Sequence, residues 1–350
     1  MKLNLALTTC LLGSFLLNTA QAQKLVDEFI YDEAPFPQCH ASTLVEISGG
    51  LAAAWFGGTA EGHRDVEIWF SQHREGQWTV PRSVANGVQK SGERFPCWNP
   101  VLFRNGDELR LYYKVGPNPR EWWGMVITSS NNGRDWSEPQ RLPEGILGPI
   151  KNKPVLVAGK RLVAGSSTEH DGWRVHMEWT DDAGVTWKKS EPLNLKGGLE
   201  SIQPTLLQLS DGRLQILCRS KNARKVTTAF SEDQGATWSE ITATSLPNNN
   251  AGLDAVTLQD GRHVLVYNHL IRGRNQLHVA ISKDGRNWEA VTVLENEPGQ
   301  EFSYPAVIQT SDGLVHITYT WKRRRVKHVV MDPARVESTP IVDGEWPVQK

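Results

Sequence analysis

The chain has 350 residues, a formal net charge of −1 at pH 7 and 22% charged residues. A charge this close to zero argues against a nucleic-acid partner and against an anionic membrane surface, because both require an excess of basic residues. Small molecules and glycans remain as ligand classes, and the length allows either two domains or one large all-β domain.

The first 22 residues have the pattern of a cleavable export signal. Lys2 precedes an apolar run, and Ala20-Gln21-Ala22 supplies the small residues of a cleavage site. No later stretch approaches the roughly 20 apolar residues that a membrane span needs. We therefore expect a secreted or periplasmic monomer without membrane insertion.

Cleavage after Ala22 would remove Cys10 and leave Cys39, Cys97 and Cys218. An odd number at irregular spacing defines neither a disulfide framework nor a zinc site, and a single Cys39–Cys97 pair stays open. The chain also has no His/carboxylate ligand spacing and no phosphate-binding glycine loop. We expect no metal and no organic cofactor.

A turn written SEDQGATW at residues 231–238 has relatives along the whole chain. The closing tryptophans are Trp78, Trp136, Trp187, Trp238 and Trp288, so the spacing is 50 to 58 residues. Ser and Asp can hydrogen-bond the backbone of their own turn, and Gly supplies a positive φ. The pattern predicts tight Asp-box turns in which each tryptophan packs as a plug.

A second pattern repeats independently of these turns. Its six copies are HASTL, NPVLF, KPVLV, QPTLL, DAVTL and YPAVI, starting at residues 40, 99, 153, 203, 254 and 304. Each copy is followed by a Gly-containing turn and another apolar strand, as expected for a meander. Repeats of this length with four strands predict a six-bladed β-propeller over residues 24–335, with a tail at 336–350. The last unit has only three clear strands, and residues 24–31 are expected to supply its fourth.

The innermost strands of a propeller start at one mouth of the central channel, so their first residues should surround that mouth. These residues are His40, Asn99, Lys153, Gln203, Asp254 and Tyr304. The second strands return to the same mouth with Gly57, Tyr113, Ser166, Arg219, Asn268 and Thr320. Loops at this face carry Glu61, Asp65, Glu200, Arg274 and the tryptophans Trp98, Trp122 and Trp123, which could stack on sugars. The sequence therefore predicts the functional site at this mouth and structural turns at the other face.

Several of these residues also have ordinary structural explanations. Asn99, Lys153 and Gln203 could cap strands, and His40 could be a buried histidine with its hydrogen bonds satisfied. Arg219 follows the apolar LQILC and must find an anionic partner if it is buried, which an internal ion pair would provide.

The Asp-boxes and the mouth residues resemble the sialidase superfamily, and more closely its sialidase-like repeat branch. The resemblance implies an exo-acting glycosidase in which Tyr304 of FSYPAV is the nucleophile and Glu200 its proton acceptor. It also implies that Arg219 of LCRS and Arg274 of RNQLHV hold the substrate carboxylate, and that Asp65, or else Glu61, is the acid. Asp254, Asn99, Gln203 and Asn268 complete the expected substrate-binding set with His40.

The sequence departs from the sialidase pattern at His40, which stands where the family has its first arginine. A histidine lacks the two-pronged guanidinium and can be neutral near pH 7. We therefore expect a terminal acidic sugar, either sialic acid or another carboxylated sugar. A uronide lyase using His40 or Tyr304 as base, and a non-catalytic glycan-binding propeller, are the alternatives.

Overall fold

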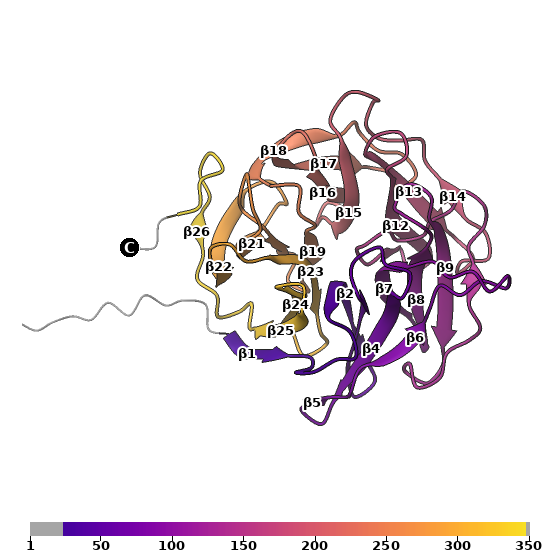
Figure 1. Cartoon of the computed structure of the whole chain (residues 1–350). Helices are drawn as coiled ribbons and strands as arrows, with labels where there is room; N and C mark the ends of the chain where they lie inside the picture. The colour runs from indigo at the N-terminus through magenta and orange to yellow at the C-terminus, as the bar shows by residue number, and fades with distance from the viewer. Residues whose placement is uncertain (1–23, 348–350) are drawn as a thin grey trace, which may run out of the picture.

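The structure is a computed structural model that describes residues 24–347, so the expected export signal lies outside the described residues. All regular elements in this range are strands, arranged as six sheets around a central axis (Figure 1). No helix long and apolar enough to cross a membrane occurs in residues 24–347. The predicted six-bladed β-propeller is confirmed.

The first three blades follow one another along the chain. Blade 1 contains β2 (Gln38–Ile47), β3 (Gly50–Gly58), β4 (Glu67–Arg74), β5 (Gln77–Trp78) and β6 (Arg82–Ala85). Blade 2 contains β7 (Cys97–Asn105), β8 (Glu108–Val115), β9 (Trp123–Ser129) and β10 (Gln140–Arg141). Blade 3 contains β11 (Val155–Val157), β12 (Arg161–Thr168), β13 (Arg174–Thr180) and β14 (Lys188–Lys189).

The remaining blades bring the two ends of the described chain into the ring. Blade 4 contains β15 (Ser201–Gln208), β16 (Leu214–Ser220), β17 (Lys225–Ser231) and β18 (Thr242–Pro247). Blade 5 contains β19 (Asp254–Thr257), β20 (His263–Tyr267), β21 (Gln276–Ser282), β22 (Trp288–Asn296) and β26 (Thr339–Pro340). Blade 6 contains β23 (Phe302–Gln309), β24 (Val315–Trp321), β25 (Arg325–Met331) and β1 (Lys24–Phe29).

The ring closes through blade 6, where β1 pairs antiparallel with β25. The N-terminal strand thus supplies the fourth strand of the last unit, as predicted. Tail residues Thr339 and Pro340 add a strand to the outer edge of blade 5 by pairing with β22. Both pairings join segments that are far apart in sequence, so they hold the ring of blades closed.

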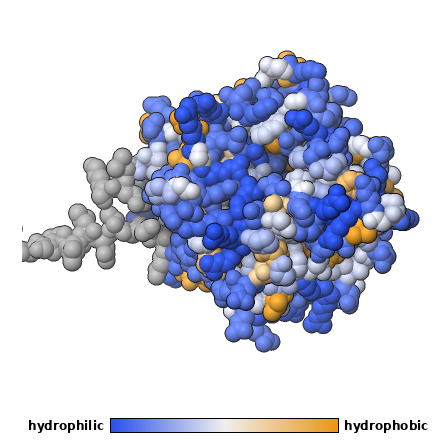
Figure 2. All heavy atoms as spheres, in the orientation of Figure 1, coloured by the Kyte–Doolittle hydropathy of each residue, from blue (hydrophilic) through white to orange (hydrophobic). Residues whose placement is uncertain are grey.

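The hydrophobic core lies between neighbouring blades. Strands of blades 1 and 2 bury Ile68 and Phe70 against Leu102 and Leu111, and comparable clusters fill the other blade interfaces. The face seen in Figure 2 is mostly hydrophilic, with hydrophobic residues scattered over it. This distribution fits blades that pack sheet against sheet and expose their loops.

Asp-box turns form in blades 2 to 5, and those of blades 3 and 4 have the same full set of hydrogen bonds. The related SQHREGQW of blade 1 forms the β4–β5 hairpin instead. Asp233 Oδ1 accepts the backbone N–H of Thr237 at 2.8 Å, and Asp233 Oδ2 accepts the Thr237 hydroxyl at 2.6 Å. Ser231 Oγ accepts the N–H of Gly235 at 2.9 Å, and the Trp238 indole donates to the Gly235 carbonyl at 3.1 Å. The turn therefore satisfies its own polar groups.

A β-bulge interrupts the innermost strand of blades 1, 2, 4 and 6 near the mouth. The bulged residues have positive φ: Ala41 at 57°, Asn99 at 35°, Gln203 at 57° and Tyr304 at 53°. A non-glycine residue in this region costs on the order of 1–3 kcal/mol, and such strain concentrates at functional sites. Four copies of one strained bulge thus surround the mouth.

The described cysteines Cys39, Cys97 and Cys218 are all free and buried, so the open Cys39–Cys97 pairing is not formed. Burial raises the pKa of the Cys39 thiol to about 12. Since the thiolate is the reactive form, these side chains act as small apolar core residues.

Candidate active site

Tyr304 lies at the centre of the mouth, on the bulge of β23. Its hydroxyl is contacted by the Arg219 guanidinium, and the amide nitrogen of Gln203 lies 3.4 Å from it. The His40 ring packs against the tyrosine ring with 4.0 Å between ring centroids. Side chains of blades 1, 4 and 6 therefore meet at one phenol, and the structure brings Tyr304, Arg219, Gln203 and His40 together there.

Arg219, at the end of β16, is a buried cation with only 6% of its surface exposed. Its Nη1 donates to Gln203 Oε1 at 3.2 Å, and its guanidinium carbon lies 4.6 Å from the Trp173 ring centroid. Within residues 24–347 Arg219 forms no salt bridge, and its Nε has no hydrogen-bond partner. The internal ion pair considered from the sequence is thus not formed, and the guanidinium keeps unused donors at the mouth.

Arg274 and Arg323 form a second cationic pair beside Tyr304, joined by one carboxylate. Arg274 Nη1 and Arg323 Nε lie 3.1 and 2.9 Å from Glu301 Oε1. Arg323 Nη1 also lies 2.5 Å from Glu61 Oε2. The Arg274 guanidinium carbon is 5.8 Å from the Tyr304 ring centroid, so this pair faces the phenol from blades 5 and 6.

His40 is buried and neutral. Burial, with smaller contributions from the charges of Arg323, Arg274, Arg219 and Lys151, holds the pKa of His40 well below its usual range. Its Nδ1 lies 2.9 Å from the Thr320 hydroxyl, which fixes the ring against Tyr304. The imidazole therefore adds no positive charge to a pocket whose charge comes from neighbouring blades.

The bulge also explains why His40 is not the geometric equivalent of the other strand-start residues. His40 pairs with Phe56 as Trp98 pairs with Lys114 and Ile202 pairs with Arg219. Ala41, rather than His40, thus has the position of Asn99, Gln203 and Tyr304. The predicted ring of first-strand residues is shifted by one residue in blade 1.

Below the phenol, Asp254 holds the blades together. Its Oδ1 accepts the Thr205 hydroxyl at 2.7 Å, and its Oδ2 accepts the Val307 N–H at 2.8 Å and the Lys153 ammonium at 2.9 Å. Asp254 is 1% exposed, so its carboxylate is used within the protein. This places Asp254 and Lys153 in a structural layer under the mouth rather than on its surface.

Lys151 belongs to the same layer and escaped the sequence analysis. Its ammonium donates to the Leu253 carbonyl at 3.1 Å and to the Pro305 carbonyl at 2.5 Å, and it lies 5.7 Å from the Tyr304 ring centroid. Burial lowers the pKa of Lys151 to about 7. It stabilises the carbonyl that follows Tyr304.

Two further predicted residues are buried near the channel. Asn268 donates to the carbonyls of Gln276 and Phe302 at 2.6 and 2.8 Å, which anchors β20 to β23. Asn99 is 5% exposed on its bulge. Their side chains lie in the propeller interior, so a contact between either residue and substrate stays a prediction.

The predicted acid–base residues lie farther out on the rim. Glu200 Oε1 accepts the backbone N–H of Trp173 at 3.3 Å and lies 3.3 Å from the Lys221 ammonium, rather than at the Tyr304 hydroxyl. Asp65 accepts the Thr59 N–H and hydroxyl and lies 2.7 Å from His63 Nδ1.

These contacts lower the pKa of Asp65 to about 2, although partial burial acts in the opposite direction. In this state Asp65 is ionised at neutral pH. A donor of protons at that pH needs a higher pKa.

Glu169, just after β12, is a rim carboxyl that the sequence analysis missed. Burial raises its pKa, and the charges of Arg219 and Arg120 and the Trp173 side chain reduce that rise. A carboxyl with a raised pKa at the mouth is a candidate proton donor. No sequence motif marks Glu169, because it follows the end of a strand in a repeat of ordinary composition.

Arg323 and Glu301 were also missed for a local reason. Arg323 sits in the basic run Lys322–Arg325, which has the appearance of a solvated turn. A positive φ of 59° at Arg323 and the hydrogen bond from the Cys39 N–H to its carbonyl turn that segment toward blade 1. Only the closed ring brings this side chain beside His40.

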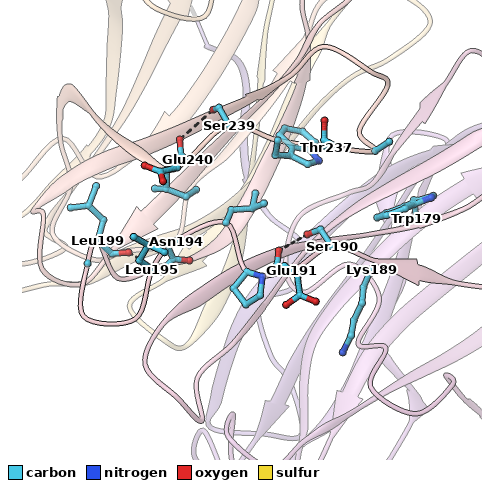
Figure 3. A pocket seen from close by; sticks show the side chains of 16 residues that line it. Trp179, Lys189, Ser190, Glu191, Asn194, Leu195, Leu199, Thr237, Ser239 and Glu240 are labelled. Atoms are coloured by element: carbon cyan, nitrogen blue, oxygen red, sulfur yellow. Dashed lines mark hydrogen bonds between the residues drawn. The ribbon is translucent and has the colours of Figure 1, made fainter.

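Hollows occur elsewhere on the molecule and differ from the mouth in their chemistry. The one between blades 3 and 4, of about 680 Å³, is lined by Trp179, Leu195 and Thr237 among others (Figure 3). There Ser190 and Ser239 each donate to the carbonyl of the next residue, so these polar groups serve the backbone locally. No three His, Cys, Asp or Glu side chains within residues 24–347 are grouped as metal ligands.

Comparison with known proteins agrees with this architecture. Residues 49–317 match the BNR repeat-like domain. The chain belongs to this family. A sialidase of Clostridium perfringens is 25% identical over 199 residues, covering 50% of this chain and 51% of that protein. A sialidase of Paraclostridium sordellii is 25% identical over 230 residues, covering 55% of this chain and 54% of that protein. This BNR-repeat chain thus spans about half the length of the curated relatives it matches.

Solved structures show the same fold for this sialidase-like BNR propeller. A protein of unknown function from Dyadobacter fermentans superposes with a TM-score of 0.73 at 15% identity, covering 89% of this chain and 99% of the other. The NanB sialidase from Streptococcus pneumoniae superposes with a TM-score of 0.69 at 13% identity, covering 91% of this chain and 71% of the other. The intramolecular trans-sialidase from Ruminococcus gnavus gives 0.69 at 13% identity, covering 89% and 98%.

Proposed function

We propose that this sialidase-like propeller is an exo-acting glycoside hydrolase that removes a terminal acidic sugar from a glycan. The observation that carries the proposal is Arg219, a buried guanidinium that touches the Tyr304 hydroxyl and forms no salt bridge within the described residues. Glu169 lies near enough to interact with this charge but does not form a salt bridge with it, so a buried guanidinium without a direct ionic partner favours an anionic ligand.

The anion suggested by this charge is a sugar carboxylate. Guanidinium groups bind carboxylates through paired, charge-assisted hydrogen bonds, and Arg274 and Arg323 lie near Tyr304, where they are also paired with Glu301 and Glu61. Glu301 holds these two guanidiniums together at distances of 3.1 and 2.9 Å. The guanidinium carbons of Arg219 and Arg274 lie 5.5 and 5.8 Å from the Tyr304 ring centroid, and this proximity favours an acidic sugar bound beside the phenol.

In this reaction Tyr304 attacks the anomeric carbon as the bond to the leaving oxygen breaks, and water then hydrolyses the glycosyl–tyrosine bond. Arg219 stabilises the phenolate character of Tyr304 in both steps. A phenol suits a substrate whose own carboxylate would repel an anionic nucleophile, and tyrosine is a known alternative to the paired carboxylates of most glycosidases. Glu200 is the proposed proton acceptor. It must exchange its contacts with Trp173 and Lys221 for Tyr304, so its replacement is a direct test of this route.

Protonation of the leaving oxygen has three candidates at the rim. Asp65 and Glu61 come from the sequence prediction, and Glu169 is added by its position near Arg219 and its raised pKa. Glu61 is engaged with Arg323, and Asp65 with Thr59 and His63. A loss of the alkaline limb of the pH–rate profile in only one of the three carboxylate-to-amide variants will identify the acid.

A uronide lyase is the second candidate, and one observation favours it. The described polar contacts of the Tyr304 hydroxyl are a guanidinium and an amide, with the neutral His40 ring beside the phenol. A lyase needs a base next to a carboxylate that is neutralised by cations, and this set of groups meets that need without a carboxylate base. The product then carries a double bond that absorbs in the ultraviolet.

The test is a panel of sialosides, uronides and plant or algal oligosaccharides, followed by reducing-end and ultraviolet detection. Saturated acidic monosaccharide supports the hydrolase, and an ultraviolet-absorbing product replaces it with the lyase. Binding without turnover leaves a glycan-binding propeller. Tyr304→Phe is the inactive reference, and Tyr112→Phe, in the wall of blade 2, is the matched control.

Which acidic sugar is the preferred substrate depends on His40. Replacing a guanidinium by a neutral imidazole removes charged hydrogen bonds worth about 1.5 to 3 kcal/mol each, so simple sialosides should react at least about tenfold more slowly than the true substrate. His40→Arg should improve the use of a sialoside if the remaining clamp is intact. Efficient wild-type release of sialic acid, with no gain in the variant, would assign an ordinary sialidase specificity.

A further inference from the structure

The loop between β3 and β4 of blade 1 places one of its carboxylates on a cation of the mouth. Glu61 Oε2 lies 2.5 Å from Arg323 Nη1, although the two residues are 262 positions apart in sequence. The same guanidinium is held through Nε by Glu301, whose Oε1 lies 2.9 Å away. Arg323 therefore has two carboxylate partners, one just before β23 and one in an exposed loop.

Glu61 is the larger of the two charges that act on Arg323. Burial lowers the pKa of Arg323, but the charges of Glu61 and then of Glu301 outweigh burial, so this pKa lies above its usual value. Glu61 also acts on the opposite rim, because its charge adds to the burial that raises the pKa of Glu169 in blade 3. The Glu61 carboxylate therefore faces the mouth instead of the outer surface of blade 1.

The contact between Glu61 and Arg323 closes the space beside His40. The hollow that these three side chains line together with Phe56 has no room for a water molecule. His40 in turn packs on Tyr304, with 4.0 Å between the ring centroids. A sugar carboxylate that approaches Arg323 from the phenol must therefore take the place of the Glu61 carboxylate.

The loop is built so that the Glu61 side chain can leave while the backbone stays in place. Asp65 fixes the two ends of the loop by accepting the Thr59 N–H at 3.0 Å and the Thr59 hydroxyl at 2.6 Å. Within residues 24–347 the Glu61 carboxylate makes no hydrogen bond or salt bridge except the one with Arg323. Its side chain is 42% exposed, so rotation about its own bonds moves the carboxylate into solvent.

We propose that Glu61 is an internal competitor of the substrate, which occupies Arg323 until the carboxylate of an acidic sugar displaces it. The inference rests on the proposed function for the identity of the ligand, but displacement does not require turnover. An acidic sugar keeps Arg323 paired, whereas an uncharged sugar would leave it without this partner, so Glu61 favours acidic sugars. The cost is affinity, because only the fraction of molecules with Glu61 displaced can bind.

The test measures the affinity for acidic monosaccharides. Galacturonate, glucuronate and N-acetylneuraminate are titrated calorimetrically into the wild-type chain and into Glu61→Gln, which should bind the best of them about tenfold more tightly. Glu61→Asp keeps the charge but has a shorter reach, so it should give a smaller gain. Glu337→Gln, at an exposed glutamate after blade 6, is the matched control and should change nothing.

A second background separates release of Arg323 from a general change in charge. In Arg323→Gln, the further change Glu61→Gln should improve binding less than about twofold, because no guanidinium remains to be released. Loss of all acid binding in Arg323→Gln, beside the gain in Glu61→Gln alone, also supports the proposal, because it places the ligand on Arg323. An equal gain in both backgrounds would overturn it, as would unchanged or weaker binding in Glu61→Gln.

The outcomes for competition and for hydrolysis differ. Tighter acid binding in Glu61→Gln with no turnover of any panel glycan by the wild type would retain the competition and remove the proposed hydrolysis. Turnover of an acidic glycan by the wild type, with equal acid affinity in both proteins, would retain the hydrolysis and remove the competition. Failure of every acid to bind either protein would overturn the competition, and wild-type turnover on the panel would then decide the hydrolysis separately.

Discussion

The two faces of this propeller treat polar groups in opposite ways. On the Asp-box face, Asp233 accepts hydrogen bonds from Thr237 and Ser231, and the Trp238 indole is paired with the Gly235 carbonyl. At the mouth, Arg219 is buried without an ion pair, and Tyr304 and Gln203 hold positive φ angles. Positive φ occurs at both faces, as at Gln234 of the Asp-box turn, so the two faces differ in the unpaired guanidinium at the mouth rather than in backbone strain.

The largest expected effect is at the centre of the mouth. Tyr304→Phe removes the hydroxyl contacted by Arg219 and Gln203 and should lower kcat/KM at least about 1000-fold, because a covalent or basic role of the phenol has no substitute. Steady-state kinetics on the best panel substrate measure the loss, with Tyr112→Phe as control. Residual activity within tenfold of wild type would remove Tyr304 from the reaction.

Arg219→Met separates function from stability at the same face. The variant should lose about 100-fold in kcat/KM, because the carboxylate contact is absent. Its free energy of unfolding should stay equal or rise by up to about 2 kcal/mol, because a buried unpaired charge is replaced by an apolar side chain of similar length. Urea unfolding measures the second quantity. A clear destabilisation would show that Arg219 supports the fold instead of the ligand.

Asp233→Ala gives the reverse pattern on the opposite face. The turn loses its acceptor for the Thr237 N–H and hydroxyl, which should lower the free energy of unfolding by about 1–3 kcal/mol. The kcat/KM at temperatures well below the unfolding transition should not change. Asp107→Ala, at a fully exposed aspartate, is the control. An activity loss in Asp233→Ala at constant stability would contradict the division between the two faces.

The smallest expected effect comes from buried histidines outside both faces. Burial lowers the pKa of His269 to about 4 and that of His278 to about 3, and Trp346 packs on His278 with 4.5 Å between ring centroids. Their folded-state pKa values lie below the usual 6.5, so the stability they contribute is present above pH 6.5 and lost as the pH falls toward 4. Each contributes at most about 1.4 kcal/mol per pH unit in that window.

Urea unfolding at pH 7.5, 6 and 5 measures this dependence. His278→Gln should flatten the decline between pH 6.5 and 5, whereas an exposed histidine variant such as His63→Gln should not. If the free energy of unfolding falls equally steeply with pH in wild type and His278→Gln, other groups cause the loss of stability at acid pH.

Local patterns in the sequence determined the architecture of this protein. Two repeated patterns were each sufficient to predict the propeller, because turn chemistry and strand alternation act over a few residues and do not depend on distant partners. Strand signals placed Tyr304 and Arg219 at the mouth, and the resemblance to sialidases singled them out together with the loop residue Arg274. The N-terminal fourth strand of blade 6 followed from counting strands.

The composition of the pocket was decided only by tertiary structure. The lowered pKa of His40 depends on its burial and then on the charges of Arg323 and Arg274 from blades 6 and 5. The contact of Tyr304 with Gln203 depends on bulges in two blades. Arg323 lies 283 residues from His40 in sequence, and only closure of the ring brings the two side chains together. Burial, ion pairing and pKa are properties of the assembled surroundings, and that is why the sequence placed the site but not its charge balance.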